Sequence, residues 1–194
     1  IGIIGAMEEE VAALKSEMAD AKVTEFASMT FYKGTLCGKD TVVVRSGIGK
    51  VNAAICAQIL VDKFGVDTLI NTGIAGSLDA RIDIGDMVIS TDAVHHDMDA
   101  TIFGDAIGQV PRMDTRTFPA DPHLVELAVK ANEKANPQIH TFTGRVASGD
   151  QFISSGEVKA RIVENFQALC TEMEGAGIAH AAYLNKVSYV IIRA

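Results

Sequence analysis

Short runs rich in isoleucine and valine alternate along the chain with longer, alanine-rich amphipathic segments. The short runs are typical of buried strands, and the longer segments are typical of helices that cover a sheet. This alternation predicts an α/β fold around one central sheet. We expect strands at residues 1–5, 31–36, 41–45, 68–72, 86–90, 141–147, 169–171 and 187–193. We expect helices at residues 7–18, 51–64, 122–134, 156–165 and 173–184.

Local signals define several ends of these elements. The short polar turn at residues 37–40 predicts a hairpin between the second and third strands. Gly65 is expected to end its helix in the left-handed conformation, and Asp121 is expected to cap the start of the next helix. Helical periodicity also predicts which side chains of the first two helices face the core. They are Val11, Leu14, Met18, Ile55, Ile59 and Leu60.

Residues 92–121 show no clear period and contain Gly, Pro and Asp repeatedly, which predicts a long loop. Loops of this length in compact domains are usually functional or lie between subunits. We find no linker or internal repeat, so we expect residues 1–194 to form a single domain. The chain begins inside a strand and its last strand reaches Ala194 with nothing after it to cover the sheet. We therefore expect a chain truncated at both ends, without a C-terminal helix.

Composition and charge limit the classes of partner. Of the 194 residues, 48% are hydrophobic and 22% are charged, which suits one domain with a sizeable core. The net charge of −8 argues against nucleic acid and against an anionic membrane surface, because both would be repelled. No apolar run reaches the roughly 18 residues of a membrane-spanning helix, and three widely spaced cysteines fit a reducing compartment. We expect a cytoplasmic protein that binds a small molecule.

Three successive carboxylates, Glu8, Glu9 and Glu10, stand at the start of the first predicted helix. Acidic residues there complement the helix dipole, and we assign that surface role to Glu8 and Glu9. Successive side chains on a helix point about 100° apart, so only one or two of the three can face a cleft. We expect Glu10 to point inward, because Met7 and Val11 flank that side.

Glu172 and Glu174 follow an apolar strand and precede a helix of small residues. Two carboxylates at this spacing would be costly to bury unless they bind something polar. A carboxylate can accept hydrogen bonds from two neighbouring hydroxyls, so a vicinal diol is a suitable ligand. The alternative is a strand end exposed at the surface.

Other motifs point to less specific chemistry. The glycine-rich turns at 47–50 and 71–76 lack the spacing of a phosphate-binding loop, and residues 2–5 lack the third glycine of a dinucleotide fingerprint. We therefore exclude nucleoside triphosphates and nicotinamide cofactors. The cluster His95-His-Asp-Met-Asp99 suggests a metal site, but adjacent histidines seldom converge on one ion, so we expect no metal.

Six motifs together resemble the methylthioadenosine/S-adenosylhomocysteine nucleosidase family, and they occur in the family's order over the whole chain. The resemblance implies a mixed sheet flanked by helices, a homodimer, and hydrolysis of the adenine glycosidic bond without metal or organic cofactor. The motifs are Ile3-Ile-Gly-Ala-Met-Glu-Glu-Glu10, Ser46-Gly-Ile-Gly-Lys50, Asn71-Thr-Gly, Ser148-Gly-Asp150 with Phe152-Ile153, Glu172-Met-Glu174 and Ile191-Ile-Arg-Ala194.

The resemblance also implies roles for single residues. Glu10 matches the general base that activates water, and Arg193 matches the residue that orients it. Around the sugar, Glu174 matches the carboxylate that binds the ribose hydroxyls, Met173 the residue packed under the ring, and Glu172 a group that orders the network. The remaining matches are Phe152, which stacks on adenine, Ile153, whose backbone reads the adenine edge, Met7 and Ile48 in the alkylthio pocket, and Ala100, Phe103 and Pro111, supplied by the neighbouring subunit.

The chemistry is consistent with these roles. Breaking the bond between ribose and purine leaves positive charge on the sugar, so nearby carboxylates stabilise the transition state more than the ground state. The departing purine needs a proton, which the family supplies from an aspartate just after the final Arg-Ala pair. Because Ala194 is the last residue here, we expect this chain as written to be nearly inactive; proton donation is worth about 100-fold to 10,000-fold.

Two departures from the family pattern affect substrate preference. Ile74, in the substrate site, stands where several relatives carry a small hydroxyl residue, and Asp105 stands where an aromatic residue would help close the alkylthio pocket. Two other functions stay open. A purine nucleoside phosphorylase would need arginines for phosphate, whereas Asn71 and Thr72 precede the glycine turn. A non-catalytic nucleoside-binding module is the second alternative.

Overall fold

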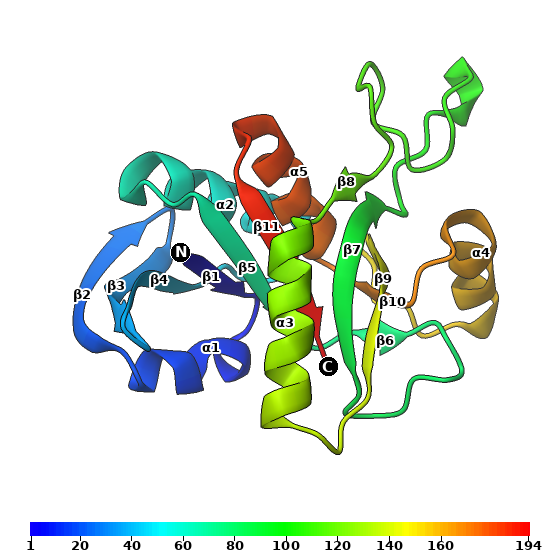
Figure 1. The fold of residues 1–194 in the computed structure, drawn as a ribbon. Helices are drawn as coiled ribbons and strands as arrows, with labels where there is room; N and C mark the ends of the chain where they lie inside the picture. Colours follow the sequence, from blue (N-terminus) through cyan, green and yellow to red (C-terminus); the bar gives the residue numbers. More distant parts are fainter.

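One mixed sheet of eleven strands organises residues 1–194 in a computed structural model (Figure 1). Its strands are β1 (Gly2–Gly5), β2 (Ala19–Phe26), β3 (Met29–Leu36), β4 (Lys39–Arg45), β5 (Thr68–Gly73), β6 (Gly76–Ser77), β7 (Met87–His95), β8 (Phe118–Pro119), β9 (Thr141–Ser148), β10 (Cys170–Glu172) and β11 (Ser188–Arg193). The helices are α1 (Glu8–Ser16), α2 (Lys50–Phe64), α3 (Pro122–Ala135), α4 (Gly156–Phe166) and α5 (Gly175–Asn185). The strands follow the order β2-β3-β4-β1-β5-β11-β7-β9-β10-β6, and β8 pairs with β7. The predicted α/β class and the central mixed sheet are confirmed.

Two groups of parallel strands meet in antiparallel orientation. β4, β1, β5 and β11 form the first group, and β7, β9 and β10 form the second. The junction is the antiparallel pair β11–β7. β6 follows β5 through only Ile74 and Ala75, yet it pairs with β10 at the far edge of the second group. Because so short a connection spans little distance, the sheet curls until the ends of β5 and β10 come close together.

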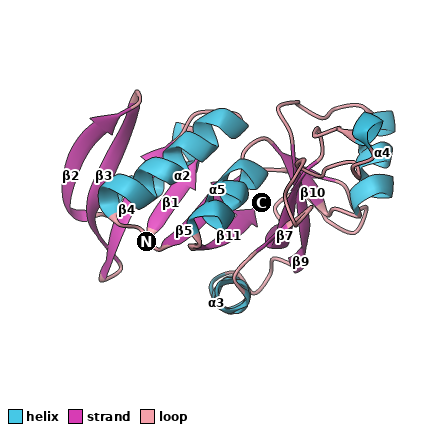
Figure 2. Cartoon of the chain, turned by 90° about the horizontal axis from the view of Figure 1, so that it is seen from above, coloured by secondary structure: helices cyan, strands magenta, loops and turns pink.

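Helices cover the two faces of the sheet according to the alternation of side chains along the strands. Ile4 and Leu69 belong to the main core with α2 and α5. Ile3 and Val43, whose side chains point to the opposite face, pack with Val11 of α1. In Figure 1, α3 lies in front of β11 and beside β7, and the view from above in Figure 2 shows α2 and α5 side by side.

The contact between α2 and α5 is close because small residues form it. The buried face of α2 consists of Ala53, Cys56, Ala57 and Leu60. A Cβ added at Gly177 of α5 would lie 2.8 Å from the carbonyl oxygen of Lys50. The prediction that Ile55 faces the core is wrong, since this side chain is 42% exposed; the small residues, rather than the bulky one, face α5. The inward positions of Ile59 and Leu60 are confirmed.

The N-terminal third differs from the prediction in two places. Helix α1 ends at Ser16, so Met18 lies outside it, although Met18 and Leu14 still pack beside the buried Val11. Strand β2 was not predicted from the pattern. It is an edge strand that is exposed along nearly its whole length and carries the charged residues Asp20, Lys22 and Glu25, so it lacks the burial pattern that reveals a half-buried strand.

The loop predicted at 92–121 is shorter than expected. β7 continues to His95, because its last residues pair with β9 as far as Ser148, and β8 adds a short pair at Phe118–Pro119. Residues 96–117, here called the projecting segment, extend away from the sheet at the top of Figure 1 and contain only the 3-10 turn Thr101–Phe103. The irregular structure predicted for this middle part is confirmed.

The signals for element ends are confirmed where the sequence was specific. The Asp121 side chain accepts hydrogen bonds from the amides of His123 and Leu124 at the start of α3. Gly65 ends α2 with a φ of 65°, which glycine adopts without steric cost. Strands β3 and β4 form the expected antiparallel hairpin.

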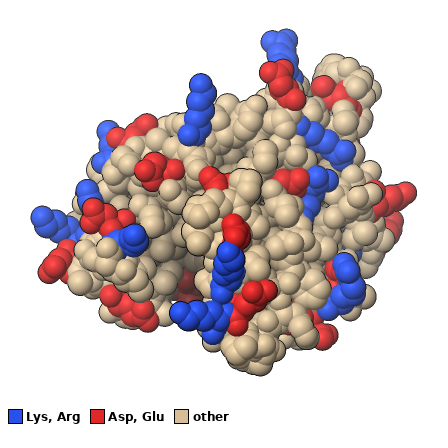
Figure 3. Space-filling view, viewed as in Figure 1, with Lys and Arg blue, Asp and Glu red and all other residues tan.

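The surface carries charges of both signs. Lysine and arginine side chains are interspersed with aspartate and glutamate on the face seen in Figure 3, so no block of one sign dominates it. None of the helices combines the length and the apolar character that crossing a membrane requires.

Candidate active site

A cleft of about 380 Å³ opens where the strands of the two groups end. Nine residues predicted from the sequence line it: Met7, Glu10, Ile48, Ile74, Phe152, Ile153, Glu172, Met173 and Glu174. Five further lining residues were not singled out: Ala6, Ala75, Gly76, Gln151 and Thr171. Each of these five lies within two positions of a predicted residue, so the motifs identified the right segments but not every side chain in them.

Glu10 points into the cleft, as predicted. Its Oε2 accepts hydrogen bonds from the amides of Ala6 and Met7 at 2.7 and 3.0 Å, and its Oε1 accepts one from the amide of Ile74 at 3.1 Å. Glu8, by contrast, pairs with Lys15 at the surface at 2.8 Å. Backbone amides from two segments of the chain, the turn after β1 and the turn after β5, therefore hold Glu10 in place.

Arg193, at the end of β11, lies beneath the cleft and is 1% exposed. Its Nη2 donates to Asn71 Oδ1 at 2.8 Å, to Glu172 Oε2, and to Glu174 Oε2 at 3.4 Å. Its Nη1 lies 3.7 Å from Glu10 Oε1. One guanidinium therefore faces three carboxylates, and when all three are ionised the cluster has a net negative charge.

Glu172 is fixed by the start of α5. Its Oε2 accepts from the amides of Glu174 and Gly175 at 3.1 and 2.7 Å, and its Oε1 accepts from the Ser148 hydroxyl. That hydroxyl in turn accepts from the amide of Ala176 at 2.7 Å. These donors are the free amides of a helix N-terminus, which favour a negative charge. Glu172 and Glu174 are 8% and 4% exposed. The prediction that these two carboxylates are buried is confirmed, and the alternative of an exposed strand end is excluded.

Glu174 lines the cleft and is only partly satisfied by the protein. Its Oε1 accepts from the amide of Gly49 at 2.9 Å, and the second oxygen is at the edge of hydrogen-bonding distance from Arg193. Burial raises the pKa of Glu174, and the charge of Glu172 raises it further. A carboxylate in this state has capacity for hydroxyl donors from a ligand.

Apolar side chains form the mouth of the cleft. Phe152 is 87% exposed, Ile74 is 63% exposed and Ile48 is 54% exposed. Exposed large hydrophobic groups at the rim of a cleft that also contains a few polar groups are typical of ligand-binding sites, because they lose contact with water when a ligand binds. The aromatic ring of Phe152 is available to stack on a planar group.

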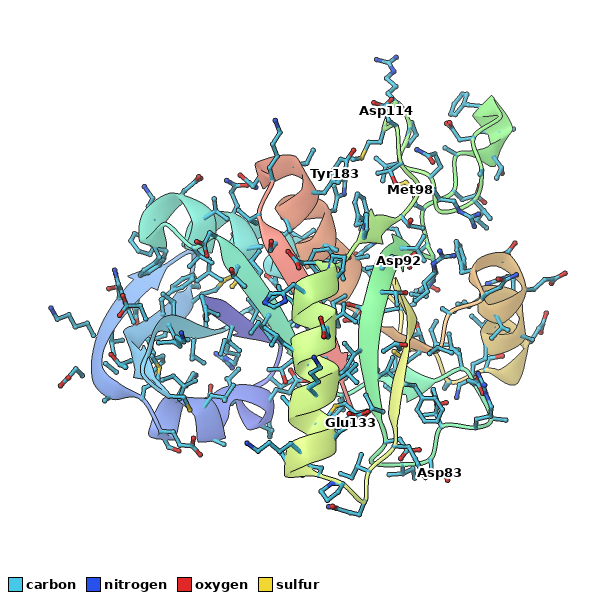
Figure 4. All side chains as sticks on the ribbon, viewed as in Figure 1. Asp83, Asp92, Met98, Asp114, Glu133 and Tyr183 are labelled. Carbon is cyan, nitrogen blue, oxygen red and sulfur yellow. The ribbon has the colours of Figure 1, made fainter.

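Besides Arg193, which lies beneath the cleft, three predicted residues do not line it. Ala100, Phe103 and Pro111 all belong to the projecting segment, and Phe103 is 85% exposed. Figure 4 labels Met98 and Asp114 in the same segment, which lies beyond α5 and its labelled Tyr183. Phe103 and Pro111 are exposed, whereas Ala100 is buried within its own chain. The contribution of these three residues to a partner's site stays a prediction.

The His95–Asp99 cluster separates into several local contacts. His95 Nε2 lies 3.3 Å from His180 Nδ1, and the ring of Phe118 stacks on His180. Asp97 pairs with Lys50, and Asp99 accepts from Thr101. The side chains of the cluster therefore point to different partners and do not converge on one point.

Known proteins match the chain over its whole length. The sequence profile described as "Phosphorylase superfamily" matches residues 1–194. A 5′-methylthioadenosine/S-adenosylhomocysteine nucleosidase from Colwellia psychrerythraea is 46% identical over 99% of this chain and 81% of that protein. Its crystal structure in complex with adenine superposes with a TM-score of 0.94 and covers 98% of this chain and 79% of that one.

A second solved structure is more similar in fold. The nucleosidase of the same name from Neisseria meningitidis, in complex with methylthio-immucillin-A, superposes with a TM-score of 0.96 at 40% identity, over 100% of this chain and 83% of that one. Both matches cover nearly the whole of this chain, including the segments that build the cleft. The chain therefore belongs to the phosphorylase superfamily and, within it, to the family of 5′-methylthioadenosine/S-adenosylhomocysteine nucleosidases.

Proposed function

We propose that this protein hydrolyses the N-glycosidic bond of adenine nucleosides such as 5′-methylthioadenosine and S-adenosylhomocysteine, releasing adenine and the thioribose. The observation that carries the proposal is the single cleft that joins Glu10, Glu174 and the buried Arg193 beneath the exposed ring of Phe152. The names of the relatives and the adenine and methylthio-immucillin-A bound in the similar structures support it.

Glu174 binds the ribose hydroxyls in this mechanism. As the bond between C1′ and N9 breaks, its electron pair leaves with adenine and positive charge develops on the sugar. A carboxylate next to the sugar interacts more strongly with that charge than with the neutral nucleoside, so it lowers the barrier. Met173 packs beneath the sugar ring, and Glu172 holds the start of α5 so that Glu174 keeps its position.

Glu10 acts as the general base for water. The oxygen of water attacks C1′ while its proton passes to Glu10, and Arg193, which is 3.7 Å from Glu10, orients the pair. The departing adenine takes up one proton, which the family supplies from an aspartate just after its final Arg-Ala pair. Backbone donors from Ala6, Met7 and Ile74 hold the carboxylate in place. No metal or organic cofactor takes part in the proposed reaction.

The apolar residues of the cleft bind the two ends of the substrate, the adenine base and the 5′-alkylthio group. Phe152 stacks on adenine, and the backbone of Ile153 reads its edge. Met7, Ile48 and Ile74 lie on the side that we assign to the sugar and its 5′-alkylthio group. These assignments rest on the match to the family motifs and on the shared cleft.

We also propose that the protein is a cytoplasmic homodimer that acts in methionine salvage. Free cysteines at positions 37, 56 and 170 fit a reducing compartment. Ala100, Phe103 and Pro111 of the projecting segment would complete the alkylthio pocket of the neighbouring subunit. The 85% exposure of Phe103 is costly in an isolated chain and suits such a contact.

The role of Glu10 is tested by Glu10→Gln in the full-length protein, with adenine release measured in the presence and absence of phosphate. Glu10→Gln is expected to lower kcat by about 100-fold to 10,000-fold, the usual contribution of a general base. Release should not depend on phosphate. Glu9→Gln is the matched control, because Glu9 stands on the same helix turn and is exposed. Equal rates for Glu10→Gln and the unmodified protein would remove Glu10 from the mechanism, and strict phosphate dependence would indicate a phosphorylase.

A further inference from the structure

Three parallel strands end side by side next to the cleft. His95 at the end of β7 is paired with Ser148 at the end of β9, and Ser148 is paired with Glu172 at the end of β10. The residues that follow each strand, including Asp97, Asp150 and Glu174, therefore lie near one another. Asp97 and Asp150 have no role in the reaction proposed above.

The start of α2 connects these three strand ends. Its Gly49 amide donates to Glu174 Oε1 at 2.9 Å, and its Lys50 amide donates to Asp150 Oδ1 at 2.8 Å. The Lys50 ammonium forms an ion pair with Asp97 Oδ1, and the other oxygen of Asp97 accepts from the amide of Asp150 at 2.9 Å. The contacts among Asp97, Lys50 and Asp150 form a closed ring, with the Gly49–Glu174 contact beside it.

The loop that carries Phe152 depends on this ring. Residues 151–154 make no hydrogen bond of their own, and Phe152 is 87% exposed. The polar contacts that hold the loop before Phe152 are the amide of Gly149, which donates to the Glu172 carbonyl at 3.1 Å, and the two contacts of Asp150. Asp150 is therefore the nearest polar anchor of Phe152, and Ile153 on its other side packs against a smaller core cluster.

We propose that Asp97, Lys50 and Asp150 are positioning residues, which hold the Phe152 loop and the Gly49 amide in the arrangement that lets one nucleoside contact Phe152 and Glu174 at once. The proposal rests on the proposed function, because it assigns the adenine to Phe152 and the ribose to Glu174. It also gives the first residues of the projecting segment a structural connection to the cleft of their own subunit.

The Lys50–Asp97 ion pair of the ring differs from an ordinary surface ion pair, which contributes little, although Asp150 itself is exposed. The side chains of Lys50 and Asp97 are only 16% and 18% exposed, and both oxygens of Asp97 are occupied. Burial by itself would raise the pKa of Asp97, but the Lys50 ammonium and the Asp150 amide outweigh it, so the pKa lies below its usual value. The Asp150 carboxylate accepts from the Lys50 amide in the first turn of α2.

A tryptophan reporter tests the proposal directly. The chain contains no tryptophan, so Phe152→Trp provides a single fluorophore on the loop, and its ring can still stack on adenine. In this background Asp97→Ala is expected to lower the fluorescence anisotropy of the folded protein, to increase quenching by acrylamide, and to weaken adenine binding by about 10-fold, which corresponds to about 1.4 kcal/mol.

Asp99→Ala is the matched control. Asp99 lies in the same segment, but its carboxylate contacts only Thr101, so the anisotropy and the adenine affinity should not change. Lys50→Met removes the same ion pair from the other side and should reproduce the effect of Asp97→Ala, whereas Asp97→Glu should restore part of it. A merely structural role would lower the melting temperature without changing the anisotropy of the folded protein.

The outcomes separate this proposal from the proposed function. If neither the unmodified protein nor the reporter protein with Asp97 intact binds adenine, the proposed function fails, while the anisotropy still reports whether the ring orders the loop. If it binds adenine and neither Asp97→Ala nor Lys50→Met changes anisotropy or affinity, the positioning role is overturned. If Asp97→Ala does not fold, Lys50→Met alone decides the question by the same two measurements.

Discussion

The charge balance of the cleft is set by single residues. Arg193 is the only cation in contact with Glu10, Glu172 and Glu174, and it is buried where a charge is stable only if it is paired and hydrogen-bonded. The surplus of negative charge is unfavourable in the free protein. It becomes favourable when the sugar develops positive charge, which is the requirement for catalysis by differential binding.

Gly73 is expected to tolerate no side chain. An added Cβ would contact both Arg193 Nη1 and Glu10 Oε1, so Gly73→Ala must separate this pair. We expect Gly73→Ala to lower stability by about 1–3 kcal/mol, as for overpacking elsewhere, and to lower kcat/KM. Urea unfolding and adenine release measure the two effects. Gly76→Ala is the control for stability, because its Cβ would meet Thr171 at an ordinary 3.8 Å; equal losses in both variants would contradict the argument.

The raised pKa of Glu174 predicts how ligand affinity depends on pH. Burial, followed by the charge of Glu172, raises this pKa above the ordinary 4.5, so the folded protein holds the proton more tightly than the unfolded chain does. Ionisation of Glu174 therefore lowers the free energy of unfolding as pH rises from 4.5 through the pKa of the folded state. Because the ionised form accepts the ribose hydroxyls, nucleoside affinity should weaken as pH falls through the same range.

Titration calorimetry with a nucleoside analogue, at a series of pH values, tests this dependence. The midpoint of the change in affinity should lie above 4.5, and Glu174→Gln should bind more weakly with a flatter profile. A midpoint at or below 4.5 in the unmodified protein would contradict a raised pKa in the folded state.

At the scale of elements, the start of α5 and the start of α2 converge on the cleft. The amides of α5 fix Glu172, and those of α2 fix Glu174 and Asp150. Both helices must approach closely for these contacts to form together. The small residues on their shared face allow that approach, and the bulky Ile55 accordingly points outward.

Gly177→Ala tests this packing. The added Cβ would lie 2.8 Å from the Lys50 carbonyl oxygen, which is backbone and cannot turn aside. We expect a loss of about 1–3 kcal/mol in the free energy of unfolding, together with weaker nucleoside binding because the two helix starts move apart. Gly156→Ala, at the start of α4, meets nothing within 4 Å and should be neutral in both measurements. Unchanged stability in Gly177→Ala would show that the helices can separate freely.

At the scale of the whole molecule, the projecting segment stands out because it exposes large apolar side chains, which a single chain does not explain. It leaves the sheet after His95 and carries the exposed side chains Ile102 and Phe103, which are 87% and 85% exposed. The cleft of the same chain does not include them. A partner subunit would bury these side chains and receive them at its alkylthio pocket.

Mixed dimers test whether Phe103 acts in the partner's site. Glu10→Gln and Phe103→Ala, each impaired alone, would form a heterodimer with one intact site: the cleft of the Phe103→Ala chain completed by the segment of the Glu10→Gln chain. Random pairing at equal amounts should then give roughly a quarter of the unmodified activity. Adenine release by the refolded mixture measures it, and activity no higher than the mean of the two variants would mean that the segment does not act across subunits.

Local signals in the sequence were sufficient for much of the protein. The α/β class, most strands and helices, the Asp121 cap and the inward side of Glu10 follow from the chemistry and periodicity of neighbouring residues, and these have the same consequences in any fold. The family motifs also identified nine residues of the cleft. The polar edge strand β2 could not be predicted, since no buried face imposes a pattern on it.

Only the tertiary structure decided which of these residues meet. The approach of β10 to the ends of β5 and β11 depends on the antiparallel junction and the curl of the sheet, and the ring of Asp97, Lys50 and Asp150 depends on where β7, β9 and α2 end. The exposure of Ile55 depends on the small residues of a helix more than a hundred positions away. Contacts between distant segments reflect the order of strands and the packing of helices, which no local pattern encodes.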